Sequence, residues 1–288
     1  MKIADALDEA AKFLSENRIA EPRRDANLLL GFVLNRDRAF LIAHSHDSLL
    51  GETSELFLNL ISRRAKGEPI QYLTGKQEFF GLEFEVSTDV LIPRPETEIL
   101  VEAALEILKG KENPYICDVG TGSGCIPISL LKNLENASAV ALDISPEAIK
   151  VAERNAEKHG VSDRIEFYES DVFAVFSNPQ IAIRNPQFEV IVSNPPYIPN
   201  KDLPGLPREV RSFEPHPALF GGVTGLEIVQ ELLTGAPRFL CENGFLLFEI
   251  GYTQGEAVRR MIDPEIWRLR DVLDDLQGIP RIVVLQRV

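Results

Sequence analysis

Cysteine, histidine and long apolar runs are all scarce in this sequence, and each shortage argues against a class of protein. The three cysteines show neither metal-ligand spacing nor even pairing, which predicts reduced thiols in a cytoplasmic protein. The four histidines form no cluster, so we expect no metal. No apolar run reaches the roughly 18 residues of a transmembrane helix, and the first residues include acids instead of a signal-peptide core.

Basic residues are outnumbered as well. The chain has 30 Lys and Arg against 44 Asp and Glu, a net charge of −14. Phosphate contacts supply most of the non-specific affinity for nucleic acids, so a chain this acidic is poorly suited to bind DNA or RNA. The same charge suits a protein partner with a basic surface. We therefore expect a protein partner, with no direct contact to nucleic acid or membrane.

The sequence patterns divide the chain into three regions. Residues 1–75 show only helical periodicity, and residues 76–94 alternate like a β-hairpin linker. In residues 95–288 strand and helix patterns alternate, which predicts a mainly parallel sheet with helices on both faces. The final strands, near 267–273 and 280–287, should pair antiparallel. The predicted fold is α/β, with a Rossmann-like sheet that has an antiparallel last strand, preceded by a small all-helical domain.

A glycine-rich loop joins a buried strand at 115–119 to a helix that begins at Cys125. The loop consists of Gly120, Thr121, Gly122, Ser123 and Gly124. Strand, glycine loop and helix together are typical of a nucleotide-type cofactor site, because glycine lets a ligand lie against the backbone. The spacing differs from the dinucleotide fingerprint, which disfavours a bound pyrophosphate. A plain tight turn remains the alternative.

Carboxylates follow the next two predicted strands. Asp143 ends one strand, and Ser145 already fills the N-cap of the helix that follows, which leaves Asp143 free to accept both ribose hydroxyls of an adenosine. Asp171 follows the third strand and could accept from an adenine amino group, with Val172 against the ring. A helix-start signal and an ordinary acidic loop are the structural alternatives.

Asn194, Pro195, Pro196 and Tyr197 end the apolar strand at 188–193. Two consecutive prolines cannot continue a strand ladder, so the chain must leave the sheet there. The Asn194 side-chain oxygen and the Pro195 carbonyl are acceptors that can hold both hydrogens of a planar NH2 group, with the Tyr197 ring beside them. An enzyme that alkylates an amide or an exocyclic amine needs such a pair. A strand-ending turn is the alternative.

These motifs resemble, in order and spacing, those of class I S-adenosylmethionine (AdoMet) methyltransferases. Three further segments, 92–98, 209–215 and 218–226, make nearly the whole chain similar to the HemK/PrmC family of release factor glutamine methyltransferases. One departure is visible, because residues 177–187 read as an inserted, turn-rich loop. The segment 195–223 is long and proline-rich, and we interpret it as a wall of the substrate cleft.

The resemblance implies methyl transfer from AdoMet to the side-chain amide nitrogen of a glutamine, the GGQ-motif glutamine of peptide chain release factors, with S-adenosylhomocysteine as product and no metal. It assigns the glycine loop, Asp143, Asp171, Val172 and Asn194 to the cofactor. The substrate would bind Asn194, Pro195, Pro196 and Tyr197, of which Asn194, Pro195 and Tyr197 are catalytic. The helical domain would recognise the substrate or serve only in packing. Alternatives are a ribosomal-protein glutamine, an adenine amine in nucleic acid, or a nucleotide-binding sensor without activity.

Overall fold

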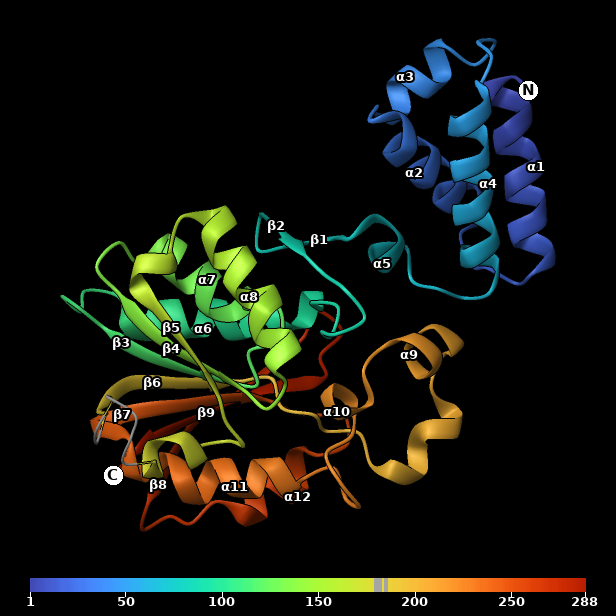
Figure 1. The fold of residues 1–288 in the computed structure, drawn as a ribbon. Helices are drawn as coiled ribbons and strands as arrows, with labels where there is room; N and C mark the ends of the chain where they lie inside the picture. Colours follow the sequence, from blue (N-terminus) through green and yellow to red (C-terminus); the bar gives the residue numbers. More distant parts are fainter. Residues whose placement is uncertain (179–182, 184–185) are drawn as a thin grey trace. The chain divides into compact units, whose positions relative to one another are not determined.

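A computed structural model of the chain describes residues 1–178, 183 and 186–288 (Figure 1). The described residues form two compact units. The first contains Met1–Lys76 together with Leu206–Phe213, and the second contains Gln77–Gly205 and Glu214–Val288. The sequence patterns had not indicated that residues 206–213 group with the N-terminal helices. Most of the expected insertion at 177–187 lies outside the described residues.

The first unit is helical. Its helices are α1 (Ile3–Glu16), α2 (Pro22–Leu34), α3 (Arg38–Ala43), α4 (Gly51–Ala65), α5 (Ile70–Thr74) and α9 (Arg208–Phe213). In α1, apolar residues recur every three or four positions, so Ile3, Leu7, Ala10 and Leu14 share one face, which is buried against the other helices.

An ion pair to the buried Arg64 links α9 to the other helices of this unit. The Arg64 guanidinium lies 2.6 Å from Asp25 Oδ2 through Nε and 2.7 Å from Glu209 Oε1 through Nη2. The Arg64 and Asp25 side chains are both 8% exposed, whereas that of Glu209 is 43% exposed. Arg64 therefore binds a residue 145 positions away in the chain.

We predict that Arg64→Ala lowers the free energy of unfolding by about 3–5 kcal/mol, because it leaves the Asp25 carboxylate buried without a counter-charge. Glu209→Ala should cost at most about 1 kcal/mol, since its carboxylate is partly solvated. Urea unfolding followed by circular dichroism measures both. Equal losses in the two variants would contradict the argument from burial.

The second unit is built around a seven-stranded sheet with the order β5-β4-β3-β6-β7-β9-β8. A separate hairpin consists of β1 (Lys76–Phe79) and β2 (Leu82–Glu85), and the sheet strands are β3 (Tyr115–Val119), β4 (Ser138–Asp143), β5 (Ile165–Glu169), β6 (Phe188–Ser193), β7 (Leu240–Glu249), β8 (Trp267–Asp274) and β9 (Pro280–Arg287). Neighbours from β5 to β7 pair parallel, and β9 pairs antiparallel with both β7 and β8. The predicted fold class is confirmed.

Helices cover both faces of this sheet (Figure 1). One face carries α6 (Glu98–Leu108), α7 (Cys125–Asn133) and α8 (Pro146–His159), and the other carries α11 (Glu227–Gly235) and α12 (Gly255–Met261). The short helix α10 (His216–Leu219) and the 3₁₀ turns η1 (Pro95–Thr97), η2 (Ser162–Arg164), η3 (Ala174–Ser177), η4 (Asn200–Gly205) and η5 (Ala236–Arg238) lie in the connections. Apolar cores fill both interfaces, which is why the central strands read as continuous apolar runs.

The strand order places a ligand site at one edge of the sheet. The chain runs from β3 outward to β4 and β5, then returns to place β6 on the other side of β3. Ligands of open α/β sheets bind at the carboxyl ends of the strands beside such a switch point. Val119 pairs in register with Leu142 of β4 and with Ser193 of β6, so the three strands end level with one another.

Candidate active site

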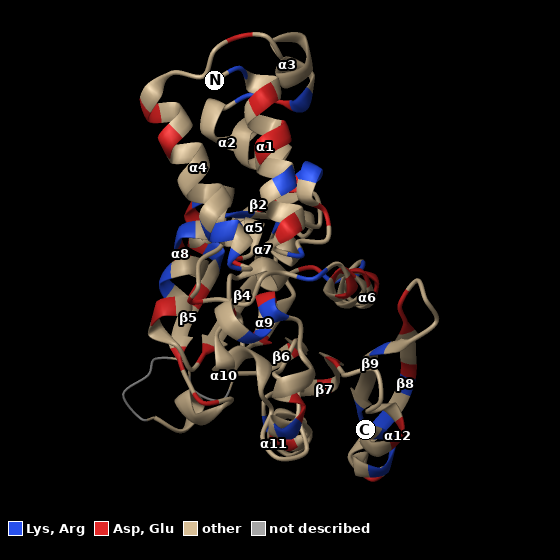
Figure 2. Cartoon of the chain, turned by 90° about the vertical axis from the view of Figure 1, so that its right-hand side faces the viewer, with Lys and Arg blue, Asp and Glu red and all other residues tan. Residues whose placement is uncertain are grey.

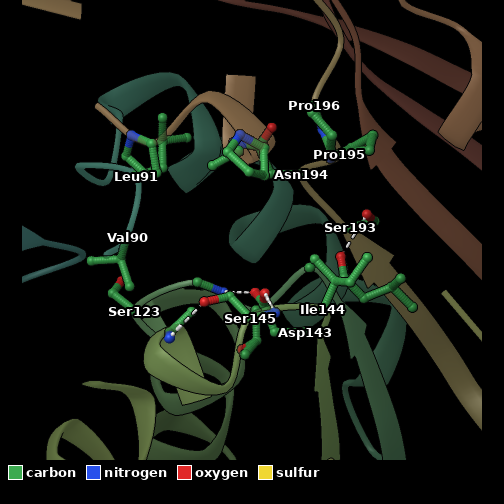
Figure 3. Close-up of a pocket in the computed structure, with 18 of the residues that line it drawn as sticks. Val90, Leu91, Ser123, Asp143, Ile144, Ser145, Ser193, Asn194, Pro195 and Pro196 are labelled. Atoms are coloured by element: carbon green, nitrogen blue, oxygen red, sulfur yellow. Dashed lines mark hydrogen bonds between the residues drawn. The ribbon is translucent and has the colours of Figure 1, made fainter. Parts of the chain in front are cut away.

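A cavity of about 380 Å³ lies at this edge of the sheet. That volume falls within the range of about 300–1,000 Å³ that is usual for small-molecule sites. The sequence-predicted residues that line it are Gly120, Thr121, Gly122, Ser123, Asp143, Asp171, Val172, Asn194, Pro195 and Pro196. Gly124 and Tyr197 are not among its lining residues. In Figure 3, Asn194 and Pro195 face Asp143 and Ser145 across the cavity.

The glycine loop is fastened to the neighbouring strand. The Gly120 and Thr121 N–H groups both donate to the Leu142 carbonyl of β4, at 2.8 and 2.9 Å. Gly124, with a φ of +79°, is the N-cap of α7. It therefore shapes the end of the loop, and its neighbours form the cavity wall.

Asp143 has a local role beside its predicted one. Its Oδ2 accepts the Gly122 N–H at 2.8 Å, and its Oδ1 accepts the Ser145 N–H at 2.9 Å (Figure 3). Each carboxylate oxygen has two acceptor positions, so one on each remains for a ligand. Burial raises the pKa of Asp143, and the two N–H donors work in the opposite direction. Ser145 Oγ accepts the Ala148 N–H at 3.1 Å, which confirms the predicted N-cap.

The turn after β5 is strained. Val172 has a φ of +44°, in the left-handed region that β-branched residues rarely adopt. The Ser170 hydroxyl donates to the Val172 carbonyl at 2.9 Å and accepts the Val175 N–H at 3.0 Å. Ser170 thereby holds Val172 buried at the cavity, while the neighbouring Asp171 is exposed.

Two glycines pack closely against the backbone that follows Asn194. A Cβ on Gly221 would lie 2.1 Å from the Pro196 carbonyl oxygen, and one on Gly225 would lie 2.2 Å from that of Tyr197. No larger residue fits at either position without moving the backbone. The Gln254 side-chain NH2 donates to the Tyr197 carbonyl at 2.9 Å. Sequence reasoning had noted these glycines only as part of a resemblance.

A buried hydrogen-bond chain lies behind Asn194. Asn194 Nδ2 donates to Thr97 Oγ1 at 3.0 Å, and the Thr97 hydroxyl donates to Glu249 Oε2 at 2.6 Å. The Tyr197 hydroxyl donates to the other Glu249 oxygen at 3.2 Å. Burial raises the pKa of Glu249, and the two hydroxyl donors lower it. Burial and the nearby Glu249 raise the pKa of Tyr197.

Sequence reasoning missed Thr97 and Glu249. It used residues 92–98 as part of the resemblance to a known family. The one available signal for Glu249 was an acid at the end of an otherwise apolar run, Phe245–Phe248. A second missed pair is Arg94 with Glu214, whose side chain is only 2% exposed. This ion pair joins the 92–98 segment to Glu214, which directly precedes the cavity-lining residue Pro215.

Asp118 is a further buried acid, at the end of β3. It is fully buried, and neither carboxylate oxygen has a hydrogen bond of good geometry within the described part of the chain, although the Thr121 hydroxyl lies nearby. Burial raises its pKa to about 7. Perturbed carboxyl groups of this kind are concentrated at functional sites.

We predict that this carboxyl makes stability depend on pH. The folded chain keeps the proton up to about pH 7, whereas the unfolded chain releases it near pH 4. Between these values the folded state binds more protons, so the free energy of unfolding falls as the pH rises. From pH 5 to pH 8 wild type should lose about 2–3 kcal/mol more than Asp118→Asn. Urea unfolding at both pH values measures this, and parallel losses would refute the raised pKa.

The described residues show neither a metal-binding cluster nor a membrane-spanning helix. No group of three or more His, Cys, Asp or Glu side chains could hold a metal ion within residues 1–178, 183 and 186–288. Over the same residues no helix is long and apolar enough to cross a membrane.

Comparison with known proteins defines the class. A methyltransferase domain family matches residues 111–256, just over half of the chain. The fold resembles a methyltransferase from Pyrococcus furiosus, with a TM-score of 0.50 and 17% identity over 78% of this chain and 98% of that one. It also resembles the hMettl16 catalytic domain, with a TM-score of 0.55 and 17% identity over 80% and 81%. Likeness at these identities concerns the fold alone. The family match shows that the chain is a methyltransferase.

Full-length relatives narrow the class to a family. A release factor glutamine methyltransferase of Moorella thermoacetica is 42% identical over 288 residues, covering 100% of this chain and 99% of the relative. One of Koribacter versatilis is 41% identical over 284 residues, covering 99% and 98%. Residues 5–75 match the PrmC N-terminal domain. The chain belongs to the release factor glutamine methyltransferase family, as its motifs predicted.

Proposed function

We propose that this protein transfers a methyl group from AdoMet to the side-chain amide nitrogen of a glutamine in a peptide chain release factor, leaving S-adenosylhomocysteine. Its full-length relatives are named release factor glutamine methyltransferases. The observation that carries the proposal is the position of Asn194 and Pro195, which line the same cavity as the glycine loop and Asp143 (Figure 3). Acceptors for an NH2 group and a nucleoside-type site thus share one cavity.

The cavity residues fit the cofactor. Each Asp143 oxygen keeps one acceptor position, which suits the two ribose hydroxyls. The backbone of Gly120–Ser123 would lie along the amino-acid part, and Asp171 with Val172 would hold the adenine. AdoMet supplies a methyl group already activated on a sulfonium, so the proposal requires no metal.

The protein's part in the reaction is to position the amide and stabilise charge. An amide nitrogen is a poor nucleophile because its lone pair is delocalised into the carbonyl. Asn194 Oδ1 and the Pro195 carbonyl would accept its two N–H groups, aim the nitrogen, and stabilise the positive charge that develops on it. The carbon–nitrogen bond would form as the carbon–sulfur bond of AdoMet breaks, and the acidified proton would then leave to water. Packing of the Tyr197 ring against the amide plane stays a prediction.

Charge supports a protein substrate. Acidic and basic residues alternate in sequence along α8 (Figure 2), and the chain as a whole has a net charge of −14. The test is incubation with methyl-labelled AdoMet and, separately, a release factor, ribosomal proteins, DNA and RNA, followed by mapping of the label. We expect label on a release factor glutamine. Label on a ribosomal-protein glutamine or on adenine, with none on the release factor, would overturn the proposal.

Asp143→Ala should weaken AdoMet binding by about 1.5–3 kcal/mol, because charge-assisted hydrogen bonds to the ribose are lost. Isothermal calorimetry measures the affinity. Thermal unfolding serves as the control, since the substitution also releases the Gly122 N–H. Unchanged affinity in a folded variant would refute the ribose assignment.

Asn194→Ala should lower the single-turnover rate of methylation by about 10²–10³, because the Pro195 carbonyl alone cannot fix the amide plane. AdoMet affinity should fall much less, since the glycine loop and Asp143 hold most of that ligand. Methylation of a release factor glutamine near the wild-type rate would show that Asn194 only ends a buried strand.

A further inference from the structure

We propose that Thr97 and Glu249 form a positioning pair that fixes which end of the Asn194 amide faces the cavity. The inference rests on the proposed function, because the methylated amide must meet an oxygen at Asn194. An asparagine amide has an acceptor end and a donor end of nearly equal size. If the NH2 end faced the substrate, two donors would oppose each other and the acceptor pair would be lost.

The direction of the hydrogen-bond chain settles the orientation. An ionised carboxylate only accepts hydrogen bonds, so the Thr97 hydroxyl must donate its single proton to Glu249, at 2.6 Å. Thr97 Oγ1 can then only accept, and its partner at 3.0 Å must be the Asn194 NH2 group. With Nδ2 held at Thr97, Oδ1 is the end left for the substrate. The Glu249 carboxylate thereby fixes the orientation of the neutral Asn194 amide through the Thr97 hydroxyl.

The pair is buried within the second unit. Thr97 lies where η1 meets α6 and is 2% exposed, and Glu249 ends β7 and is 1% exposed. Because Phe248 pairs with Ser193 in register, Glu249 lies level with Asn194 on the neighbouring strand. Burial excludes water as a substitute partner, so a reversed amide would face an oxygen without a proton.

Other groups around Glu249 complete its hydrogen bonding and charge balance. Tyr197 donates to its second oxygen, and the positive charge of Arg281 on β9 favours its ionised form. Glu96, on η1, opposes ionisation. One buried carboxylate therefore contacts two parts of the Asn194–Tyr197 corner, the Asn194 amide through Thr97 and the Tyr197 hydroxyl directly.

The test compares Thr97→Val, which keeps the shape of the side chain without its hydroxyl, with Thr97→Ser, which keeps the hydroxyl. Thr97→Val should lower the single-turnover methylation rate about 10–100-fold, a loss of the size seen when groups that orient a functional residue are removed. Thr97→Ser should retain most of the wild-type rate. AdoMet affinity by calorimetry should change in neither variant, which a general loosening of the site would not allow.

A double-mutant cycle with Asn194→Ala separates positioning from structural support. If Thr97 acts through Asn194, Thr97→Val should have little further effect on the rate once the Asn194 amide is gone. A full additional loss in that background would overturn the proposal. The matched control is Thr234→Val, which removes an exposed hydroxyl that bonds only within α11.

The outcomes distinguish this inference from the proposed function. Absence of glutamine methylation by the wild type would refute the proposed function. An active wild type with equal rates in Thr97→Val and Thr97→Ser would refute only the positioning pair. Should Thr97→Val fail to fold, Thr97→Ala tests the same point. It removes the same hydroxyl, so the rate should fall, and an unchanged rate would overturn the inference.

Discussion

The candidate site depends on one constraint: the chain must leave the sheet after β6 while its last polar side chain keeps a fixed orientation. Pro195 and Pro196 meet the first requirement, because they fix φ and offer no N–H to the ladder. Gly221 and Gly225 hold the departing backbone from one side at distances only glycine permits. The second requirement is met by Thr97 on η1 and Glu249 on β7. The corner is thus over-determined by segments distant in sequence, which is what a preorganised site needs.

Buried carboxyl groups give this end of the sheet its electrostatic character. Asp143 and Glu249 end two strands of this sheet and Asp118 is the last residue but one of a third, and burial raises the pKa of each. A ligand that brings positive charge would favour the ionised form of carboxyl groups close to it. A sulfonium cofactor has that property, whereas a pyrophosphate would oppose it. The acids and the departure from the dinucleotide spacing therefore point to the same kind of ligand.

The sequence predicted those structural features that depend on a few consecutive residues. Buried parallel strands read as apolar runs, and their ends are marked by glycine, proline or acid, so β3 and β6 were predicted to the residue. Contacts that depend on side-chain direction were not predictable. Thr97 and Glu249 are 152 residues apart, and Arg64 and Glu209 are 145 apart. No local pattern shows that Glu249 points at a threonine, or that residues 206–213 leave the expected cleft wall for the helical unit.

An acceptor pair with a fixed orientation also explains how a site without a strong base can select its substrate. A glutamine side chain offers an NH2 group whose two hydrogens match two acceptors. A glutamate of the same shape offers only oxygens, so it would place acceptors against Asn194 Oδ1 and the Pro195 carbonyl. A buried polar site rejects an analogue that leaves its groups unpaired far more strongly than an apolar pocket rejects a missing methylene. This selectivity holds only while the Asn194 amide cannot reverse, because a reversed amide would offer a glutamate oxygen a donor. In the proposed reaction the hydrogen-bond chain from Glu249 through Thr97 would therefore support recognition of the substrate as well as the geometry of transfer.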